Sequence, residues 1–270
     1  MDHGDIGLMK PDPIISALLA VLLSGGGWAS KALTAGGVAT AILVGFTILN
    51  GAGWPGAAVL GAFFILSSAV GRIGPAGGRA PGDAKGEQRD ASQVLANGGC
   101  AALGAVLARG NPSLALWVIT GSLASAGADT WATAIGARSR TPPRRLLFGH
   151  RVDPGSNGGM TVIGTVGALV GAGLISIAGA FTASVPPLVL WGTAIGVAGM
   201  TLDSLLGATL QGRFHCPACG VASEWKVHRC GNRTTHTGGM AWLTNDGVNA
   251  LTTAAGALAG WLAWRCCAPS

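Results

Sequence analysis

Long apolar stretches recur along the whole chain, and shorter polar segments separate them. A helix of about 17 to 25 mostly apolar residues is long enough to cross the hydrocarbon core of a bilayer. Eight stretches meet this length, near residues 14–30, 34–50, 55–71, 94–109, 113–136, 160–181, 187–210 and 240–264. The pattern therefore predicts an all-α, polytopic membrane protein with about seven or eight transmembrane helices, which form a single domain over residues 1–270.

Composition supports this class. Hydrophobic residues make up 49% of the chain and charged residues 10%, whereas a soluble domain carries about 25% charged residues. The mean hydropathy is +0.50, and the 46 glycines are typical of membrane helices that approach one another closely. The N-terminal segment has more acidic than basic residues, unlike a secretory signal, so we expect the first apolar stretch to be retained.

Basic residues indicate the orientation. The polar segments 72–93, 137–159 and 211–239, together with Lys31, hold 14 of the 17 lysines and arginines. Because basic loops stay in the cytosol, we expect these three loops there. The net charge of +6 follows from this topology, and we find no mixture of basic and aromatic residues typical of nucleic-acid binding. Five tryptophans fall near the opposite membrane face: Trp54, Trp117, Trp191, Trp261 and Trp264.

Three aspartates lie within apolar stretches, which is costly for a carboxylate unless it is paired or bound to a metal. Asp129, Asp203 and Asp246 each lie six or seven residues from the expected cytosolic end of a helix, or about 10 Å deep at about 1.5 Å per residue. Carboxylate oxygens suit Mg²⁺, which proteins hold together with substrate phosphates. Asn245 and Asn249 extend this candidate magnesium site along one helix face. Helix capping or pairing inside the bundle is the alternative role for these acids.

A polar stripe leads into the fourth apolar stretch. Lys85, Arg89, Gln93 and Asn97 recur every four residues, so they share one face of a helix. Arginine offers a planar fork to a phosphate and lysine a point charge, which makes these residues candidates for holding phosphate groups. An amphipathic helix whose basic residues touch lipid headgroups would show the same spacing.

The second basic loop ends in the sequence DPGSNGGMT, at residues 153–161. A glycine-rich turn before a helix exposes backbone N–H groups and the positive end of the helix dipole to an anion. The Gly-Lys-Ser/Thr of a Walker A loop is absent, which excludes a P-loop kinase. A turn that merely caps the next helix would need the same residues. The candidate phosphate-binding residues of this loop are Arg151, Ser156, Asn157, Gly158, Gly159 and Thr161.

The third basic loop contains a cysteine pattern. Cys216 and Cys219 form a Cys-x2-Cys knuckle, and His228 and Cys230 follow at a shorter spacing than usual. Three thiolates and one imidazole would form a tetrahedral zinc site, and four protein ligands would make its role structural. Free thiols in a reducing cytosol would need no metal. The alternative ligands in this loop are His215 and His236.

Five sequence blocks resemble those of a known family. They are QRDASQVLANGG, ADTWATAIG, DPGSNGGMTVIG, LDSLLGATLQ and TNDGVNALTT, which occur in this order between Lys85 and Gly256. On these blocks the chain is identified as a member of an integral membrane family of largely unknown function that includes phytyl-phosphate kinase. After the Asp-Thr-Trp-Ala that starts at Asp129, the family usually has Ser or Thr and then Glu, whereas this chain has Thr133 and Ala134. One carboxylate expected from the resemblance is therefore missing.

The resemblance implies a membrane-embedded kinase. Its substrates would be a nucleoside triphosphate, CTP or ATP, and an isoprenyl (phytyl-like) monophosphate, which would become the diphosphate. In phosphoryl transfer the protein supplies mainly positioning and charge neutralisation. We therefore expect the three aspartates to hold Mg²⁺ against the donor, with help from Asn97, Asn245 and Asn249. The residues expected to clamp phosphates are Lys85, Arg89 and Arg151.

Two other classes of function fit the same residues. A secondary transporter of an anionic substrate also places polar residues beside interrupted helices, and Asp129-Thr130 and Asp203-Ser204 echo each other as internal repeats do. Transporter sites usually lie near the middle of the membrane, however, whereas these acids are expected near its cytosolic face. A non-catalytic membrane scaffold that recruits a partner through the cysteine-rich loop is the third class.

Overall fold

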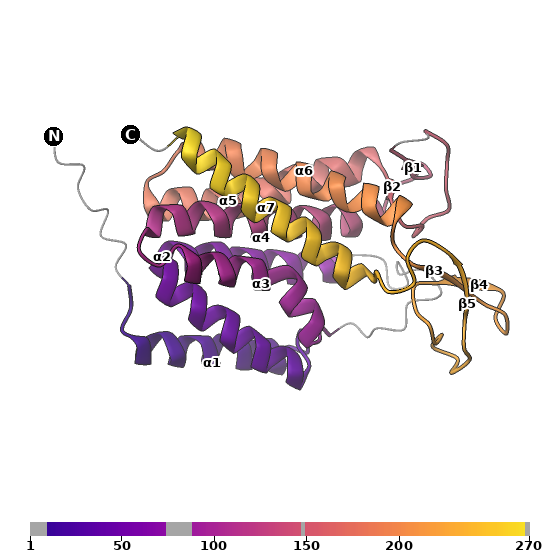
Figure 1. The fold of residues 1–270 in the computed structure, drawn as a ribbon, viewed down its shortest axis with the longest axis horizontal. Coiled ribbons are helices and arrows are strands. Elements are labelled where there is room, and N and C mark those ends of the chain that lie inside the picture. Colours follow the sequence, from indigo (N-terminus) through magenta and orange to yellow (C-terminus); the bar gives the residue numbers. More distant parts are fainter. Residues whose placement is uncertain (1–9, 74–87, 147–148, 268–270) are drawn as a thin grey trace.

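Seven helices make up most of the described chain, which covers residues 10–73, 88–146 and 149–267 of the computed structural model (Figure 1). The predicted all-α class is confirmed, and three of the helices, α2, α5 and α6, are long and apolar enough to cross a membrane. The helices are α1 (Pro13–Ala29), α2 (Ala35–Ile73), α3 (Ala91–Leu107), α4 (Pro112–Gly136), α5 (Val162–Ala183), α6 (Pro187–Thr209) and α7 (Asn245–Cys267).

Helix α2 turns back on itself at Gly53, which has a left-handed φ of 61°. In a straight helix, residues 45 and 60 would be about 22 Å apart at about 1.5 Å per residue. Instead, a Cβ atom added at Gly45 would lie 3.8 Å from the Leu60 side chain. Arg72, near the end of α2, likewise donates a hydrogen bond of 3.1 Å to the carbonyl of Ser30, just before its start. The two halves of α2 therefore correspond to the two separate apolar stretches that the sequence predicts there.

The helices lie side by side along the long axis of the molecule, and all the strands gather at one end (Figure 1). We call this end the loop end; its described residues are 30–34, 88–90, 137–146, 149–161 and 210–244. Helix α4 contacts α2, α3, α5, α6 and α7, and its residues from Ala115 to Ala128 are all buried. The Asp129 side chain thus projects from the central helix, at the loop end of its buried segment.

Close approach of backbones holds α4, α6 and α7 together. A Cβ atom added at Gly196 of α6 would lie 2.9 Å from the carbonyl oxygen of Ala124 on α4. Gly121 of α4 and Gly256 of α7 face each other so closely that a Cβ atom on either would overlap the carbonyl oxygen of the other. Small residues at such crossings are the usual means of packing helices in a membrane.

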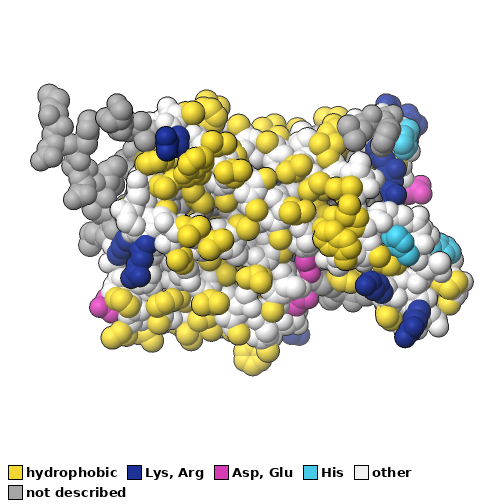
Figure 2. All heavy atoms as spheres, in the orientation of Figure 1, with side chains coloured by type: hydrophobic (Ala, Val, Ile, Leu, Met, Phe, Trp, Pro, Cys, Tyr) yellow, Lys and Arg dark blue, Asp and Glu magenta, His cyan; other side chains and the backbone are white. Residues whose placement is uncertain are grey.

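Apolar side chains cover the outside of the bundle, as expected for a protein surrounded by lipid. Phe181 is 84% exposed and Leu190 is 74% exposed. In Figure 2, apolar side chains spread over the helices, and lysine and arginine side chains lie toward the two ends. The predicted tryptophan belt is only partly correct, because Trp117 is 3% exposed and packs inside the bundle. Trp54 and Trp191 are exposed and fit the prediction.

Two of the predicted loops contain small sheets. Antiparallel strands β1 (Arg144–Arg145) and β2 (Gly159–Met160) close the second basic loop. The third basic loop forms an antiparallel sheet in the order β4-β3-β5. Its strands are β3 (Arg213–Cys216), β4 (Val221–Ser223) and β5 (Thr235–Gly238).

Candidate functional site

Asp129 and Asp203 lie on the neighbouring helices α4 and α6 at the same level. A Cβ atom added at Gly192 of α6 would touch Thr120 of α4, and one added at Gly199 would touch Ser125. These contacts show that the two helices run parallel, and one further turn along each helix leads from Gly199 to Asp203 and from Ser125 to Asp129. The two carboxylates are close enough to interact electrostatically. The structure thus brings together two of the three predicted aspartates.

The Asp203 carboxylate is incompletely satisfied. Its Oδ2 atom is buried and has no hydrogen-bond partner among the described residues. Within the same ranges, no lysine or arginine forms an ion pair with Asp129 or Asp203. Buried polar atoms almost always have a partner, and an unpaired one often marks an ion or a water site. The pair of acids therefore has the chemistry of a cation site.

Glu224 is a third acid at this place, and the sequence did not single it out. It follows β4 in the third basic loop and also interacts electrostatically with Asp203. The buried Gln211 holds it there, because its Nε2 atom donates a hydrogen bond of 3.3 Å to Glu224 Oε1. The signal that could have indicated Glu224 is its rarity, since the chain contains only one other glutamate, Glu87.

Asp246 of α7 lies at a level similar to that of Asp129, but its side chain is hydrogen-bonded to helix α3. Contacts of Gly256 with Gly121, and of Gly260 with the Trp117 carbonyl, show that α7 runs antiparallel to α4. Extending this register places Asp246 opposite Trp131, within half a turn of the level of Asp129. The same register places Asn249 opposite Ala128, and Asn245 is the first residue of α7.

The Asp246 carboxylate accepts a hydrogen bond of 2.8 Å from the Ser92 hydroxyl of α3. Ser92 Oγ is also 2.8 Å from Asp90 Oδ1, so one hydroxyl lies between two carboxylates. Asp90 caps α3 by accepting a hydrogen bond of 2.9 Å from the Gln93 backbone N–H. In return, Gln93 Oε1 accepts a hydrogen bond of 3.1 Å from the Asp90 backbone N–H. Gln93, a predicted phosphate ligand, therefore uses its carbonyl oxygen as part of a capping box.

The rest of the predicted polar stripe has mixed surroundings. The Arg89 guanidinium lies over the aromatic rings of Phe63 and Phe64, at 5.6 and 6.0 Å from their centroids. Asn97 is half-buried, two turns into α3. Lys85 lies outside the described residues. Stacking on two rings gives Arg89 a packing role, whatever else it binds.

The glycine-rich segment docks onto the acid-bearing helix α6. Gly158 has a φ of +72°, and a Cβ atom added to it would overlap the Ser204 carbonyl oxygen, next to Asp203. Only glycine satisfies both the left-handed backbone and this close approach. Thr161 caps α5, because its hydroxyl accepts a hydrogen bond of 3.1 Å from the Gly164 N–H.

The backbone N–H groups of this segment are partly used within the turn itself. The Ser156 N–H bonds to the Asp153 carbonyl and the Gly159 N–H to the Ser156 carbonyl, each at 3.0 Å. Asn157 packs near Gly207 of α6. The predicted anion site made of these N–H groups is therefore only partly available.

A hollow of about 510 Å³ with mainly basic charged residues lies in this loop. Its polar lining consists of Arg145, His150, Arg151 and Ser156, with one acid, Asp153. The Nε atom of Arg145 is buried and has no hydrogen-bond partner among the described residues. Two predicted phosphate-binding residues, Arg151 and Ser156, thus meet two basic residues that were not predicted. Such a hollow suits a polyanion.

An apolar groove of about 400 Å³ runs between α3, α4 and α7. It begins at Cys100 and Ala254 and continues away from the loop end to Leu107 and Trp261. Ala254 lies eight residues beyond Asp246 on α7, or about 12 Å along the helix. The groove therefore lies in line with the polar residues at the start of α3 and α7.

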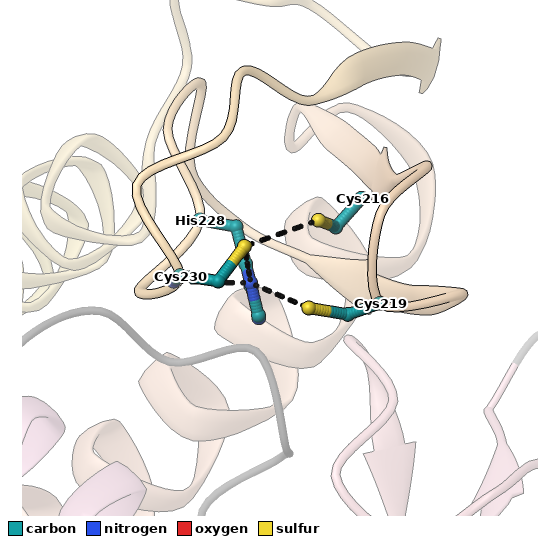
Figure 3. Close-up of side chains that lie close together, drawn as sticks. All are labelled: Cys216, Cys219, His228 and Cys230. Atoms are coloured by element: carbon teal, nitrogen blue, oxygen red, sulfur yellow. Dashed lines mark hydrogen bonds between the residues drawn. The ribbon is translucent and has the colours of Figure 1, made fainter.

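The four predicted zinc ligands converge in the third basic loop (Figure 3). Cys216 ends β3, Cys219 lies in the turn to β4, and His228 and Cys230 lie between β4 and β5. Their ligand atoms all lie within 4.8 Å of one another. The alternative ligands are not part of this cluster: His215 lies on strand β3, and His236 packs against the Phe214 ring.

The thiols of this cluster differ in acidity. Hydrogen bonding to His228, with further hydrogen bonds from Asn232, lowers the pKa of Cys230 to about 6. The hydrogen bond with Cys230 raises the pKa of Cys219 to about 11. The contacts with His228 and Asn232 therefore favour a thiolate at Cys230, whereas Cys219 is favoured as the neutral thiol.

Comparison with known proteins gives several matches. The profile of the family described as integral membrane protein DUF92 matches residues 18–257. An uncharacterized membrane protein of Methanocaldococcus jannaschii is 33% identical over 200 residues, which are 73% of this chain and 81% of that protein. Protein PGR of Arabidopsis thaliana is 29% identical over 268 residues, covering 87% and 90% of the two chains. An uncharacterized membrane protein of Synechocystis is 29% identical over 243 residues, covering 84% and 81%. No solved structure matches the chain.

Proposed function

The chain belongs to the DUF92 family of integral membrane proteins, and from the acids at its loop end we propose that it is a membrane-embedded phosphotransferase. It would transfer a phosphoryl group from a nucleoside triphosphate to an isoprenyl monophosphate, which becomes the diphosphate. The observation that carries the proposal is the buried, unpartnered Oδ2 of Asp203 beside Asp129 and Glu224. A buried carboxylate oxygen without a partner, such as Asp203 Oδ2, is costly, and a bound divalent cation would remove that cost.

The chemistry needs charge neutralisation more than it needs a base. A phosphate monoester has a second pKa of about 6, so at neutral pH it is mostly a dianion and already nucleophilic. One of its oxygens attacks the γ-phosphorus, and the bond to the bridging oxygen breaks. The nucleoside diphosphate leaves with that bonding pair. A Mg²⁺ ion held by Asp129 and Asp203, with Asp246 as a further metal ligand, would offset the negative charge of the two substrates.

The apolar groove supports a lipid acceptor. An isoprenyl chain is apolar and flexible, and a groove lined mainly by apolar side chains would take it without leaving polar atoms unpaired. The end of the groove nearest the loop end is lined by Cys100 and Ala254, about 12 Å along α7 from Asp246. We propose that the phosphate of a chain lying in the groove extends from this end toward Asp246.

The basic hollow supports a nucleotide donor. Arg145 and Arg151 line it, and the same loop packs through Gly158 against α6 beside Asp203. A triphosphate bound there would reach toward the acids from the loop side. We propose that the loop end faces the cytosol, where nucleotides are available, because it holds most of the basic residues.

Phosphoryl transfer can be tested with purified protein in lipid nanodiscs. The protein is incubated with Mg²⁺, CTP or ATP, and prenyl monophosphates of several chain lengths, and diphosphate products are detected by mass spectrometry. Asp203→Asn should lower turnover by about 100-fold or more, the range for loss of a charge that stabilises the transition state. Asp12→Asn is the matched control, because Asp12 caps the exposed start of α1 and asparagine caps equally well.

Two results would overturn the proposal. One is the absence of diphosphate with every donor and acceptor, and the other is full turnover by Asp203→Asn. A transporter would instead move an anionic substrate into sealed proteoliposomes with no change in its phosphate groups. That assay therefore separates the enzyme from the carrier.

A further inference from the structure

We propose that Cys216, Cys219, His228 and Cys230 hold a structural Zn²⁺ ion, and that this ion fixes the loop module carrying Glu224 beside Asp203. The module consists of residues 211–240, which leave the end of α6 and return to the start of α7. This metal site is separate from the proposed phosphoryl transfer, and its test does not require a measurement of turnover.

Two separations between ligand atoms are those of a tetrahedral zinc site. With Zn–S bonds of about 2.3 Å and Zn–N bonds of about 2.0–2.1 Å, a tetrahedron requires S···S distances of about 3.8 Å and S···N distances of about 3.5 Å. Cys216 Sγ and Cys230 Sγ are 3.7 Å apart. Cys219 Sγ and His228 Nδ1 are 3.5 Å apart, and His228 Nδ1 and Cys230 Sγ are 3.1 Å apart. Two of the three separations agree with the tetrahedron within about 0.1 Å.

A disulfide is not the explanation for this proximity. A disulfide requires its sulfur atoms to be about 2.05 Å apart, whereas the Cys216 and Cys230 sulfurs are 3.7 Å apart and all three cysteines are free. The site also has a hydrogen-bond donor outside the four ligands, as metal-bound thiolates usually have. Asn232 Nδ2 lies 3.4 Å from Cys230 Sγ and donates to it, as such a group does to a metal thiolate.

The module lacks a hydrophobic core of its own. Between Arg213 and Gly239, the buried apolar side chains are those of Phe214 and Cys216. His228 is buried as well, and Trp225 is half-buried. So small a core contributes little stability, and small modules of this kind usually need a metal or disulfides to fold.

Glu224 is tied to the metal cluster through short backbone connections. It directly follows β4, whose partner strand β3 ends at Cys216. On its other side, the Trp225 carbonyl accepts a hydrogen bond of 2.6 Å from the Thr234 hydroxyl, which links the two arms of the loop that contains His228 and Cys230. Loss of the metal would loosen both connections, so that Glu224 would no longer be held at Gln211 and Asp203.

Metal content is the first test. The full-length protein, purified from zinc-sufficient medium without chelators, should contain about one zinc per chain by inductively coupled plasma mass spectrometry. Cys219→Ser and the double variant Cys219→Ser/Cys230→Ser should lose most of it. Cys100→Ser is the matched control, because Cys100 lies in the apolar groove far along α3, and it should keep the zinc. Zinc-free wild-type protein, or zinc retained by the double variant, would overturn the site.

Limited proteolysis tests what the ion does, and it uses the unaltered chain. Lys226, Arg229 and Arg233 are exposed trypsin sites in the module. Chelation should speed cleavage at them at least tenfold, and added Zn²⁺ should restore protection. The internal control is cleavage at Arg140 and Arg144 in the other basic loop, which should not change. Equal cleavage rates before and after confirmed zinc removal would contradict the structural role.

Discussion

Ser92 on α3 donates its hydroxyl hydrogen to the Asp246 carboxylate on α7, and this 2.8 Å hydrogen bond joins two helix starts that are 154 residues apart in the chain. Thr253 makes a second link between these helices, since its hydroxyl donates to the Ala96 carbonyl at 2.8 Å. The first link lies at the loop end and the second lies two turns deeper. The start of α7, which carries Asp246, is therefore held by α3.

Removing the Ser92 hydroxyl should disturb the position of Asp246. Ser92→Ala should cost about 1 kcal/mol of stability, the usual worth of one hydrogen bond, and should lower turnover through the loss of a fixed Asp246. Ser92→Thr keeps the hydroxyl and should behave like the wild type. Denaturation in detergent and prenyl phosphate turnover check both effects. Unchanged turnover in Ser92→Ala would show that Asp246 needs no support from α3.

Neutralising Glu224 should weaken magnesium binding without affecting zinc. Glu224→Gln preserves a carbonyl oxygen for the hydrogen bond from Gln211 but removes one negative charge near Asp203. We expect the Mg²⁺ concentration for half-maximal turnover to rise about tenfold, which corresponds to about 1.4 kcal/mol. The zinc content of the purified variant should equal that of the wild type. A normal Mg²⁺ requirement would place Glu224 outside the magnesium site.

Adding a methyl group at the α4–α7 crossing should destabilise the bundle. In Gly256→Ala, the new Cβ atom would overlap the Gly121 carbonyl oxygen and the Ser125 hydroxyl, at a cost of about 1–3 kcal/mol from overpacking. Gly61→Ala makes the same chemical change within α2, where nothing lies within 4 Å of the new atom. That control should be as stable as the wild type or more so, by up to about 1 kcal/mol. Equal stability of the two variants would contradict the close contact.

Removing the cap of α4 should affect stability alone. Asn111 accepts a hydrogen bond of 3.0 Å from the Leu114 N–H, at the end of the bundle opposite the acids. Asn111→Ala should lower the free energy of unfolding by about 1 kcal/mol, while Asn111→Asp should retain it. Turnover at low temperature should stay normal in both. A strong loss of turnover would indicate that the far end of α4 is coupled to the acid site.

Epitope tags can test the proposed orientation. A tag between Pro154 and Gly155 lies in a basic loop, and a tag between Arg109 and Gly110 lies at the opposite end. By the charge distribution, antibody should reach the second tag in intact cells and the first only after permeabilisation. The reverse pattern would place the basic loops outside the cytosol.

The apolar pattern was sufficient to predict the helices closely. Stretch 113–136 corresponds to α4 (Pro112–Gly136) and stretch 187–210 to α6 (Pro187–Thr209). In both helices a proline in the first turn marks the start, and a change to polar residues marks the end. The start of α7 was predicted five residues early. The apolar residues before it, Trp242 and Leu243, lie in a turn that follows the bridge between Gln211 and Met240.

The candidate site was only partly predictable, because tertiary contacts complete it. The number of residues between each aspartate and the end of its helix was enough to predict that Asp129 and Asp203 lie at one depth, because rise along a helix depends on sequence position alone. Glu224 reaches them only through the fold of the third loop, whose strands of three or four residues are too short to predict where the residue after β4 lies. Ser92 joins Asp246 through a contact between distant helices, and no periodic pattern encodes such a contact.

The burial of α4 among five other helices also bears on how the protein is made. This helix is not among those apolar enough to cross a membrane by composition alone, and an aspartate within it opposes insertion by about 2.5–3.5 kcal/mol if it lies near the bilayer centre. Its neighbours α5, α6 and α7 are synthesised after it. We therefore expect stable insertion of α4 to depend in part on helices that are synthesised after it, which would make biogenesis of the C-terminal half cooperative.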